Sequence, residues 1–186
     1  MSSRKRFAKK DWLDLALSCL AQEGGSGLTV EALCNAAART RGSFYHHFAD
    51  HDVFLKELFS EWKQRNTLDV ADAIMQQPHD KRAKTLSDVA NMLDQDLERA
   101  VRQFSQSNSI ARRIVQDVDR IRTEFVVGLY RDAGLEDSLA REIAQLEYAA
   151  YVGSQIVWPD MNAQDRIRLD QRFASMVAKA FLRDAS

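Results

Sequence analysis

The scarcity of helix-breaking residues constrains this chain more than any other feature of its sequence. Its 186 residues include two prolines and seven glycines, and three of the glycines, Gly24, Gly25 and Gly27, fall in one four-residue patch. Long stretches therefore contain nothing that would interrupt a helix. The sequence shows no strand-like alternation of useful length and no internal repeat. These observations predict an all-α fold.

The composition is that of an ordinary globular protein. Hydrophobic residues make up 45% of the chain and charged residues 28%, which excludes a disordered tail protein. The length suits one domain or two small ones. No apolar run approaches the length that crosses a membrane, and the basic N-terminus lacks the apolar core of a signal peptide. We therefore expect a cytoplasmic protein with no membrane partner.

The two cysteines, Cys19 and Cys34, are too few for a disulfide framework and fit a reducing compartment. Both fall on apolar faces of predicted helices. We expect them to pack in the core, with a redox-sensing role as the alternative.

Charge is spread unevenly along the chain. The net charge is −1, but residues 1–56 carry +2 and the remainder carries −3. Five of the first ten residues are basic and none is acidic. Residues 1–8 are therefore predicted to form a basic arm, which either contacts DNA or is a solvated tail.

Helix signals divide the first third of the chain. Apolar periodicity predicts a helix over Lys9–Glu23, and the glycine patch ends it. Thr29 and Thr40 are predicted to cap the second and third helices, and Asp50 the fourth. The fourth helix either ends near Asn66 or continues to Gln77, because Pro78 stops it.

The second and third helices are joined by about three residues, which is the spacing of a helix-turn-helix motif. In such motifs the second helix enters the major groove of DNA. The short helix over residues 41–48 has side chains that suit this role. Its candidate DNA-binding residues are Thr40, Arg41, Gly42, Ser43, Tyr45 and His46.

Each of these residue types has a physical reason to face DNA. Arg41 can donate two hydrogen bonds to guanine or bind phosphate. Gly42 has no side chain, so the backbone can approach closely. The hydroxyls of Thr40, Ser43 and Tyr45 can reach phosphate oxygens, and His46 can donate to a phosphate or to a base edge. Phe44 and Phe48 face the other way and anchor the helix.

The stretch from Trp12 to Leu58 resembles, without gaps, the DNA-binding domain of the tetracycline-repressor (TetR) family. The resemblance is carried by Trp12-Leu13, Ala16, Ala21, Gly24, Thr29-Val30-Glu31, Leu33, the string Arg41-Gly42-Ser43-Phe44-Tyr45-His46-His47-Phe48, Asp50 and Leu55. It implies an N-terminal three-helix helix-turn-helix DNA-binding domain over residues 1–52. A helical bundle over residues 53–186 would bind an effector and form a homodimer. The DNA contacts implied are those of Thr40, Arg41, Ser43, Tyr45 and His46.

This chain departs from the family pattern at two places. The family's turn usually reads Gly-Val, whereas this chain has Ala38-Arg39, and alanine at a position of positive φ costs about 1 kcal/mol. Arg39 either lays its aliphatic part over the surface or adds a DNA contact. Where the family usually has a lysine that contacts phosphate, this chain has His51.

The C-terminal two thirds carry two further predictions. Each of the last two helices has two apolar rows. One row is predicted to pack in the core of the chain and the other in a four-helix dimer interface. The alternative is that both rows pack in the core. The interface residues predicted are Leu139, Ile143, Leu146, Ala150, Gly153, Val157, Leu169, Phe173, Met176 and Ala180. Polar and aromatic candidates for an effector pocket are Trp62, Asn91, Gln95, Phe104, Glu124, Tyr148, Tyr151 and Gln155.

These features predict a ligand-responsive, sequence-specific transcriptional regulator. The resemblance favours a repressor that a small molecule releases from a palindromic double-stranded operator. The alternative is a protein-binding adaptor built on the same scaffold. An enzyme is not expected, because there is no glycine-rich phosphate loop, no nucleophile elbow and no catalytic context for either cysteine. No metal site and no cofactor are predicted, although His46, His47 and His51 lie near two aspartates.

Overall fold

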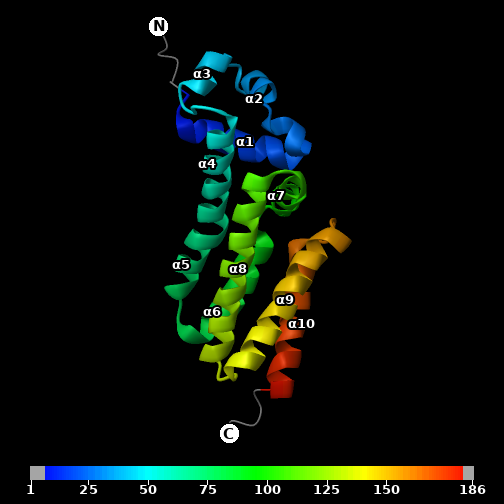
Figure 1. Ribbon diagram of the computed structural model, residues 1–186. Helices are drawn as coiled ribbons and strands as arrows, with labels where there is room; N and C mark the ends of the chain where they lie inside the picture. Colours follow the sequence, from blue (N-terminus) through cyan, green and yellow to red (C-terminus); the bar gives the residue numbers. More distant parts are fainter. Residues whose placement is uncertain (1–6, 182–186) are drawn as a thin grey trace. The chain divides into compact units, whose positions relative to one another are not determined.

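The computed structural model describes residues 7–181, and within that range every regular element is helical (Figure 1). The predicted all-α fold is confirmed. Arg4, Lys5 and Arg6 of the predicted basic arm lie outside the described residues. In the described part of the chain, no helix is both long and apolar enough to cross a membrane.

The chain divides into two compact units. The first comprises residues up to Gln64 together with Asp96–Val115, and the second comprises Arg65–Gln95 together with residues from Gln116 onward. The predicted domain boundary after residue 52 stays a prediction. The α-helices are α1 (Lys9–Glu23), α2 (Val30–Ala37), α3 (Arg41–Tyr45), α4 (His51–Lys63), α5 (Asp69–Met75), α6 (Arg82–Met92), α7 (Gln95–Ser107), α8 (Ser109–Asp132), α9 (Asp137–Val157) and α10 (Ala163–Phe181).

Aromatic side chains form the centre of the first unit. The ring of Phe44 lies 5.4 Å from that of Trp12, 5.0 Å from that of Phe48 and 5.1 Å from that of Phe54. All four side chains are fully buried. These contacts join α1, α3 and α4, so the short third helix is held by its apolar face. Figure 1 shows α1, α2 and α3 gathered at the start of α4.

The three predicted N-caps are confirmed by hydrogen bonds. Oγ1 of Thr29 accepts from the amide of Ala32 at 3.2 Å, and Oγ1 of Thr40 accepts from the amide of Ser43 at 3.3 Å. Oδ1 of Asp50 accepts from the amide of Val53 at 2.7 Å. Each bond satisfies an amide that has no partner within its helix, and so fixes where that helix begins.

Helical structure after Asp50 continues almost to Pro78, in agreement with the longer of the two alternatives. Between α4 and α5 the segment Gln64–Leu68 is π-helical. A π-turn accommodates one extra residue within a continuous helix, and such turns are frequent at functional sites. The next helical stretch is two helices, because Leu93 adopts an extended conformation between α6 and α7.

The second unit has its own core, built where α8, α9 and α10 meet. Its buried members are Val127, Leu135, Ala140, Ile143, Ala144 and Val177. The helices α6 and α10 also pack against each other, as do α9 and α10 and α5 and α6. This core leaves room beside it for a cavity, described below.

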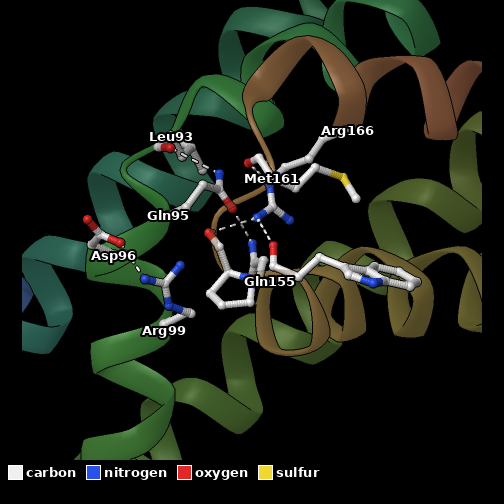
Figure 2. A network of polar contacts seen from close by, with 9 residues as sticks. Leu93, Gln95, Asp96, Arg99, Gln155, Met161 and Arg166 are labelled. Carbon is white, nitrogen blue, oxygen red and sulfur yellow. Dashed lines mark hydrogen bonds and ion pairs between the residues drawn. The ribbon is translucent and has the colours of Figure 1, made fainter.

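A buried arginine ties α10 to the C-terminal end of α9. Arg166 is 2% exposed, and its guanidinium donates to the carbonyl oxygens of Met161 at 3.1 Å and Trp158 at 2.9 Å and to Oγ of Ser154 at 2.9 Å. The carbonyl of Trp158, at the C-terminus of α9, carries partial negative charge, which offsets part of the cost of burying the cation. Figure 2 shows Arg166 beside Met161, with Gln155 and Gln95 hydrogen-bonded nearby.

Both cysteines are buried free thiols in the core of the first unit. Burial raises the pKa of each thiol above its usual value. A protonated, buried thiol is a poor nucleophile, so the predicted core-packing role fits better than redox sensing.

Candidate functional site

The turn between α2 and α3 consists of Ala38, Arg39 and Thr40, which gives the predicted helix-turn-helix spacing. Ala38 has φ 50° and ψ 47°, and it is the one non-glycine residue with positive φ in the described part of the chain. The backbone here therefore requires the left-handed conformation that glycine adopts most easily.

The short helix α3 has one buried and one exposed face. Phe44 points into the aromatic core, and Phe48 joins it there just beyond the helix. Thr40, Arg41, Gly42, Tyr45 and His46 are exposed and Ser43 is half-buried, with Tyr45 44% exposed despite its size. The outward face therefore presents hydroxyl, guanidinium and imidazole groups.

Gly42 has no packing reason to be glycine. A Cβ atom placed on it would meet only Oγ1 of Thr40, at 3.8 Å, which is ordinary contact distance. The space outside this residue is open, so a close approach of another molecule is possible there.

Arg39 and His51 are engaged within the first unit. The guanidinium carbon of Arg39 lies 5.4 Å from the centre of the Phe7 ring, and its Nη1 donates to the carbonyl of Ala38 at 3.2 Å. Nε2 of His51 lies 2.8 Å from the carbonyl oxygen of Leu28. Both side chains are half-buried.

The second unit contains a cavity of about 440 Å³, within the range of cavities that hold small molecules. It lies among α5, α6, α8, α9 and α10, together with the π-helical segment. Most of its lining is apolar: Val70, Ala71, Ala83, Leu86, Ala90, Leu93, Ile121, Phe125, Val126, Leu129, Ala133, Ala174, Val177 and Ala178, with the rings of Tyr130, Tyr148 and Tyr151.

Two acids line this apolar cavity. Oε2 of Glu147 accepts a hydrogen bond of 2.6 Å from the hydroxyl of Tyr130, and Oδ2 of Asp170 accepts from Ser87 at 3.1 Å and from Nδ2 of Asn91 at 2.5 Å. Burial raises the pKa of each carboxyl above its usual range, and the hydrogen bonds only partly oppose this. Perturbed acids in a cavity mark candidate functional sites.

The predicted effector residues fall into two groups. Tyr148 and Tyr151 line the cavity, and their hydroxyls donate to Oδ1 of Asp119 at 2.7 Å and to the carbonyl of Ala90 at 3.0 Å. The other six lie outside its lining. Asn91 bonds to Ser87 and Asp170, Gln95 and Gln155 bond to each other, and Glu124 pairs with Arg141.

Trp62 and Phe104 belong to the first unit. Nε1 of Trp62 donates to Oε1 of Glu98 at 2.9 Å, and the ring of Phe104 stacks on that of Phe59 at 5.5 Å. Both side chains therefore pack inside that unit.

The predicted dimer residues also divide by exposure. Leu146, Ala150, Val157, Leu169, Met176 and Ala180 are exposed, with Leu146 61% exposed, and Gly153 is half-buried with open space outside it. Ile143 is buried, and Leu139 and Phe173 pack against the same core of the second unit. The ten residues predicted for one interface thus divide between the core and the surface, and the dimer interface stays a prediction.

Glu147, Asp170, Tyr130 and Arg122 are cavity residues that sequence reasoning missed. The available signal was weak, because Glu147, Asp170 and Arg122 lie in helices that carry many other charged residues. A carboxylate beside an apolar stripe normally faces solvent.

Comparison with known proteins identifies the N-terminal region. Residues 13–58 match the model of the family described as bacterial regulatory proteins, tetR family. No curated protein sequence matches the chain significantly.

Solved structures show the same fold over nearly the whole chain. A transcriptional regulator from Rhodococcus sp. Rha1 is 12% identical with a TM-score of 0.79, over 94% of this chain and 97% of that one. A ketosteroid transcriptional regulator of Mycobacterium tuberculosis is 18% identical with a TM-score of 0.62, over 97% and 96%. The helix-turn-helix match and this shared fold agree with the geometry of α2 and α3. Residues 13–58 therefore form an N-terminal domain of the family described as bacterial regulatory proteins, tetR family.

Proposed function

We propose that this regulator is a cytoplasmic, homodimeric repressor that binds a palindromic DNA operator and is released from it by a small molecule. The observation that carries the DNA-binding part is the outward face of α3. Its polar side chains are exposed while Phe44 fixes the opposite face in the core. A helix anchored in this way can enter a major groove without losing its position.

The DNA contacts proposed are those of Thr40, Arg41, Gly42, Ser43, Tyr45 and His46. Arg41 is the candidate for reading a base, since its planar guanidinium can donate two hydrogen bonds to guanine. Arg39 and His51 are weaker candidates, because both already have partners within the unit. His51 could contact phosphate only through Nδ1.

A homodimer is supported by the outer apolar rows of α9 and α10. Leu146, Val157, Leu169 and Met176 are large enough to stabilise an interface and are exposed in the single chain. The open space outside Gly153 would let a facing helix approach closely. A dimer would place two copies of α3 on two half-sites, which explains how so short a helix reads a specific sequence.

Ligand responsiveness is supported by the cavity of the second unit. A mostly apolar cavity of about 440 Å³ with a few polar groups is the usual form of a small-molecule site. A ligand releases DNA only if it binds the DNA-free conformation more tightly than the DNA-bound one. Release is therefore a shift between two populations of the dimer.

The experiment that tests this function is selection of DNA by the purified full-length protein. Genomic fragments of the source organism are incubated with the protein at low salt, and the retained fragments are sequenced. We expect a few fragments that share a palindrome with half-sites about one helical turn apart, and an affinity that falls steeply with salt. Transcription from such a fragment should fall when the protein is added and recover with its ligand.

Three outcomes would contradict the proposal. A folded protein that retains no double-stranded fragment at low ionic strength is not a DNA-binding regulator. A protein that captures one stoichiometric protein partner without DNA, and whose DNA binding has no sequence preference, acts as an adaptor. Increased transcription on a selected fragment would instead identify an activator.

A further inference from the structure

The acidic groups in the cavity of the second unit restrict which class of small molecule can bind there. Glu147 and Asp170 come from α9 and α10, and both carboxyls reach its lining. The charge of Asp170 is close enough to raise the pKa of Glu147. Two acids therefore share one region of an otherwise apolar wall.

Neither acid is neutralised by a basic partner. Among the described residues, the one hydrogen bond of Glu147 comes from Tyr130, to Oε2, and no ion pair joins either acid to a lysine or arginine. Arg166 influences Asp170 electrostatically, but its guanidinium donates to helix carbonyls and to Ser154. A buried acid without a paired cation lowers stability, so a purely structural role does not explain the pair.

An uncompensated amide lies directly behind Asp170. Asn91 is 2% exposed, and its Nδ2 donates to Oδ2 of Asp170 and to the carbonyl of Ser87. Because both partners are acceptors, the orientation of the amide is fixed, with Nδ2 toward them. Its Oδ1 is buried and has no hydrogen-bond partner in the described part of the chain. Asn91 is not itself a lining residue, but it leaves one unsatisfied acceptor beside Asp170.

Most donors of the lining are already used by the protein, and the amide of Gln171 stands at an exposed position. Arg122 donates to Oγ1 of Thr67 at 3.0 Å and to the carbonyl of Asn66 at 2.9 Å. The side chain of Lys84 is 69% exposed and pairs with Asp88. The hydroxyls of Tyr148 and Tyr151 donate to Asp119 and Ala90. At the buried part of the lining an incoming ligand therefore meets mainly acceptors, which favours a ligand that brings a donor.

We infer that the cavity binds an apolar molecule that carries a protonated amine, with the amine held against the carboxyl groups of Glu147 and Asp170. The hydrocarbon part lies against Leu86, Phe125 and Leu129 and the other apolar side chains. The inference rests on the proposed effector role of this cavity and names the class of effector. A carboxylate or phosphate headgroup would face the two acids and is disfavoured by charge.

The test compares three probes with the same alkyl chain and different headgroups: decylamine, decanol and decanoate, each below its micellar concentration. Binding to the full-length dimer is measured by isothermal titration calorimetry near neutral pH. We expect decylamine to bind at least about tenfold more tightly than either of the others, since hydrogen bonds to charged groups are among the stronger polar contacts. Equal or tighter binding of decanoate, or no binding of any probe, would overturn the inference.

Substitutions of the two acids test whether the amine headgroup of the probe lies against them. In Glu147→Gln the preference for decylamine over decanol should fall about tenfold, while the affinity for decanol stays the same. The matched control is Glu142→Gln, on an exposed position of the same helix, which should leave all three affinities unchanged. An amine preference that survives both Glu147→Gln and Asp170→Asn would place the headgroup elsewhere and contradict the inference. If either variant fails to fold, the comparison of the three probes on the unmodified protein still tests whether the cavity prefers an amine.

This result is separable from the proposed function. Calorimetry reports cavity binding without DNA, and displacement of a selected operator fragment is measured independently. An amine that binds but leaves DNA affinity unchanged would contradict ligand-controlled release and leave the amine site standing. A protein that an acidic or neutral compound releases from DNA, and that binds no amine, would contradict the amine site and leave ligand-controlled release standing.

Discussion

Nε2 of His51, at the first position of α4, lies 2.8 Å from the carbonyl oxygen of Leu28, at the end of the turn that precedes α2. The bond joins two segments 23 residues apart and satisfies a backbone acceptor in a half-buried place. We expect His51→Ala to lower the free energy of unfolding by about 1 kcal/mol, because Leu28 loses its partner. Urea denaturation measures this.

The control for His51 is His46→Ala, an exposed position on α3. It should change stability by no more than about 0.5 kcal/mol. The opposite pattern, in which His51→Ala keeps its stability and loses operator affinity, would show that His51 acts at the DNA instead.

Arg41 is exposed on the outer face of α3, where a base-reading side chain has to be. We expect Arg41→Ala to weaken binding to the selected operator by about 1–3 kcal/mol and to relax specificity at one base pair of each half-site. Equal weakening on all sequences would instead assign the side chain to phosphate. Fluorescence anisotropy with matched and mismatched duplexes distinguishes the two. Arg113→Ala, at an exposed position of α8, controls for the loss of one positive charge.

Ala38 is in the left-handed conformation at the end of α2. We expect Ala38→Gly to raise the free energy of unfolding by up to about 1 kcal/mol, since glycine removes the Cβ strain and loses part of that gain to unfolded-chain entropy. Ala36→Gly, two residues earlier and within α2, should have the opposite sign, with a loss of up to about 1 kcal/mol. Equal effects of the two substitutions would mean that the turn is not strained.

The parts of the fold that depend on neighbouring residues were predictable from sequence. Thr29, Thr40 and Asp50 each cap the helix that follows, because a short polar side chain can reach an amide three residues on. Gly24 marks the end of α1 with positive φ. The alternation of polar residues with Phe44 and Phe48 likewise predicts which face of α3 is exposed.

The cavity was not predictable in the same way. Its walls come from five helices and a π-turn, and the pattern of one helix does not say whether a polar residue faces water or a hollow between helices. Glu147 adjoins Leu146, which is exposed, and Tyr148, which lines the cavity. Arg166 is another such case, because the sequence does not show that the turn before α10 brings the carbonyl oxygens of Met161 and Trp158 to its guanidinium.

Leu146 lies on the outer row of α9 and is 61% exposed in the single chain. If α9 and α10 form the dimer interface, Leu146→Glu would bury two uncompensated charges, one from each copy. We expect at least about a tenfold loss of dimer affinity with an unchanged helical content. Sedimentation velocity at micromolar concentration measures it.

The matched control is Met92→Glu, a more exposed apolar position at the end of α6 that is outside the predicted interface. It should leave the dimer intact. An unmodified protein that sediments as a single chain at micromolar concentration would refute the interface itself.

Glu147 makes the stability of the protein depend on pH. Burial raises the pKa of its carboxyl, and the charge of Asp170 adds to this, while the hydrogen bond from Tyr130 acts in the other direction. The folded state therefore keeps a proton at a pH where the unfolded chain has lost it. The resulting stabilisation is complete below the usual glutamate pKa of about 4.3 and is lost as pH rises through the raised value.

Glu147→Gln keeps an acceptor for Tyr130 and removes this titration. We expect the variant to be more stable than the unmodified protein at about pH 8 and to show a shallower decline between about pH 5 and pH 8. Urea denaturation at several pH values measures both quantities, with Glu142→Gln as the exposed control. A variant that is less stable than the unmodified protein at about pH 8 would show that the carboxylate is paired in the folded state. A more stable variant with weaker amine binding would mean that Glu147 serves ligand binding at the expense of stability.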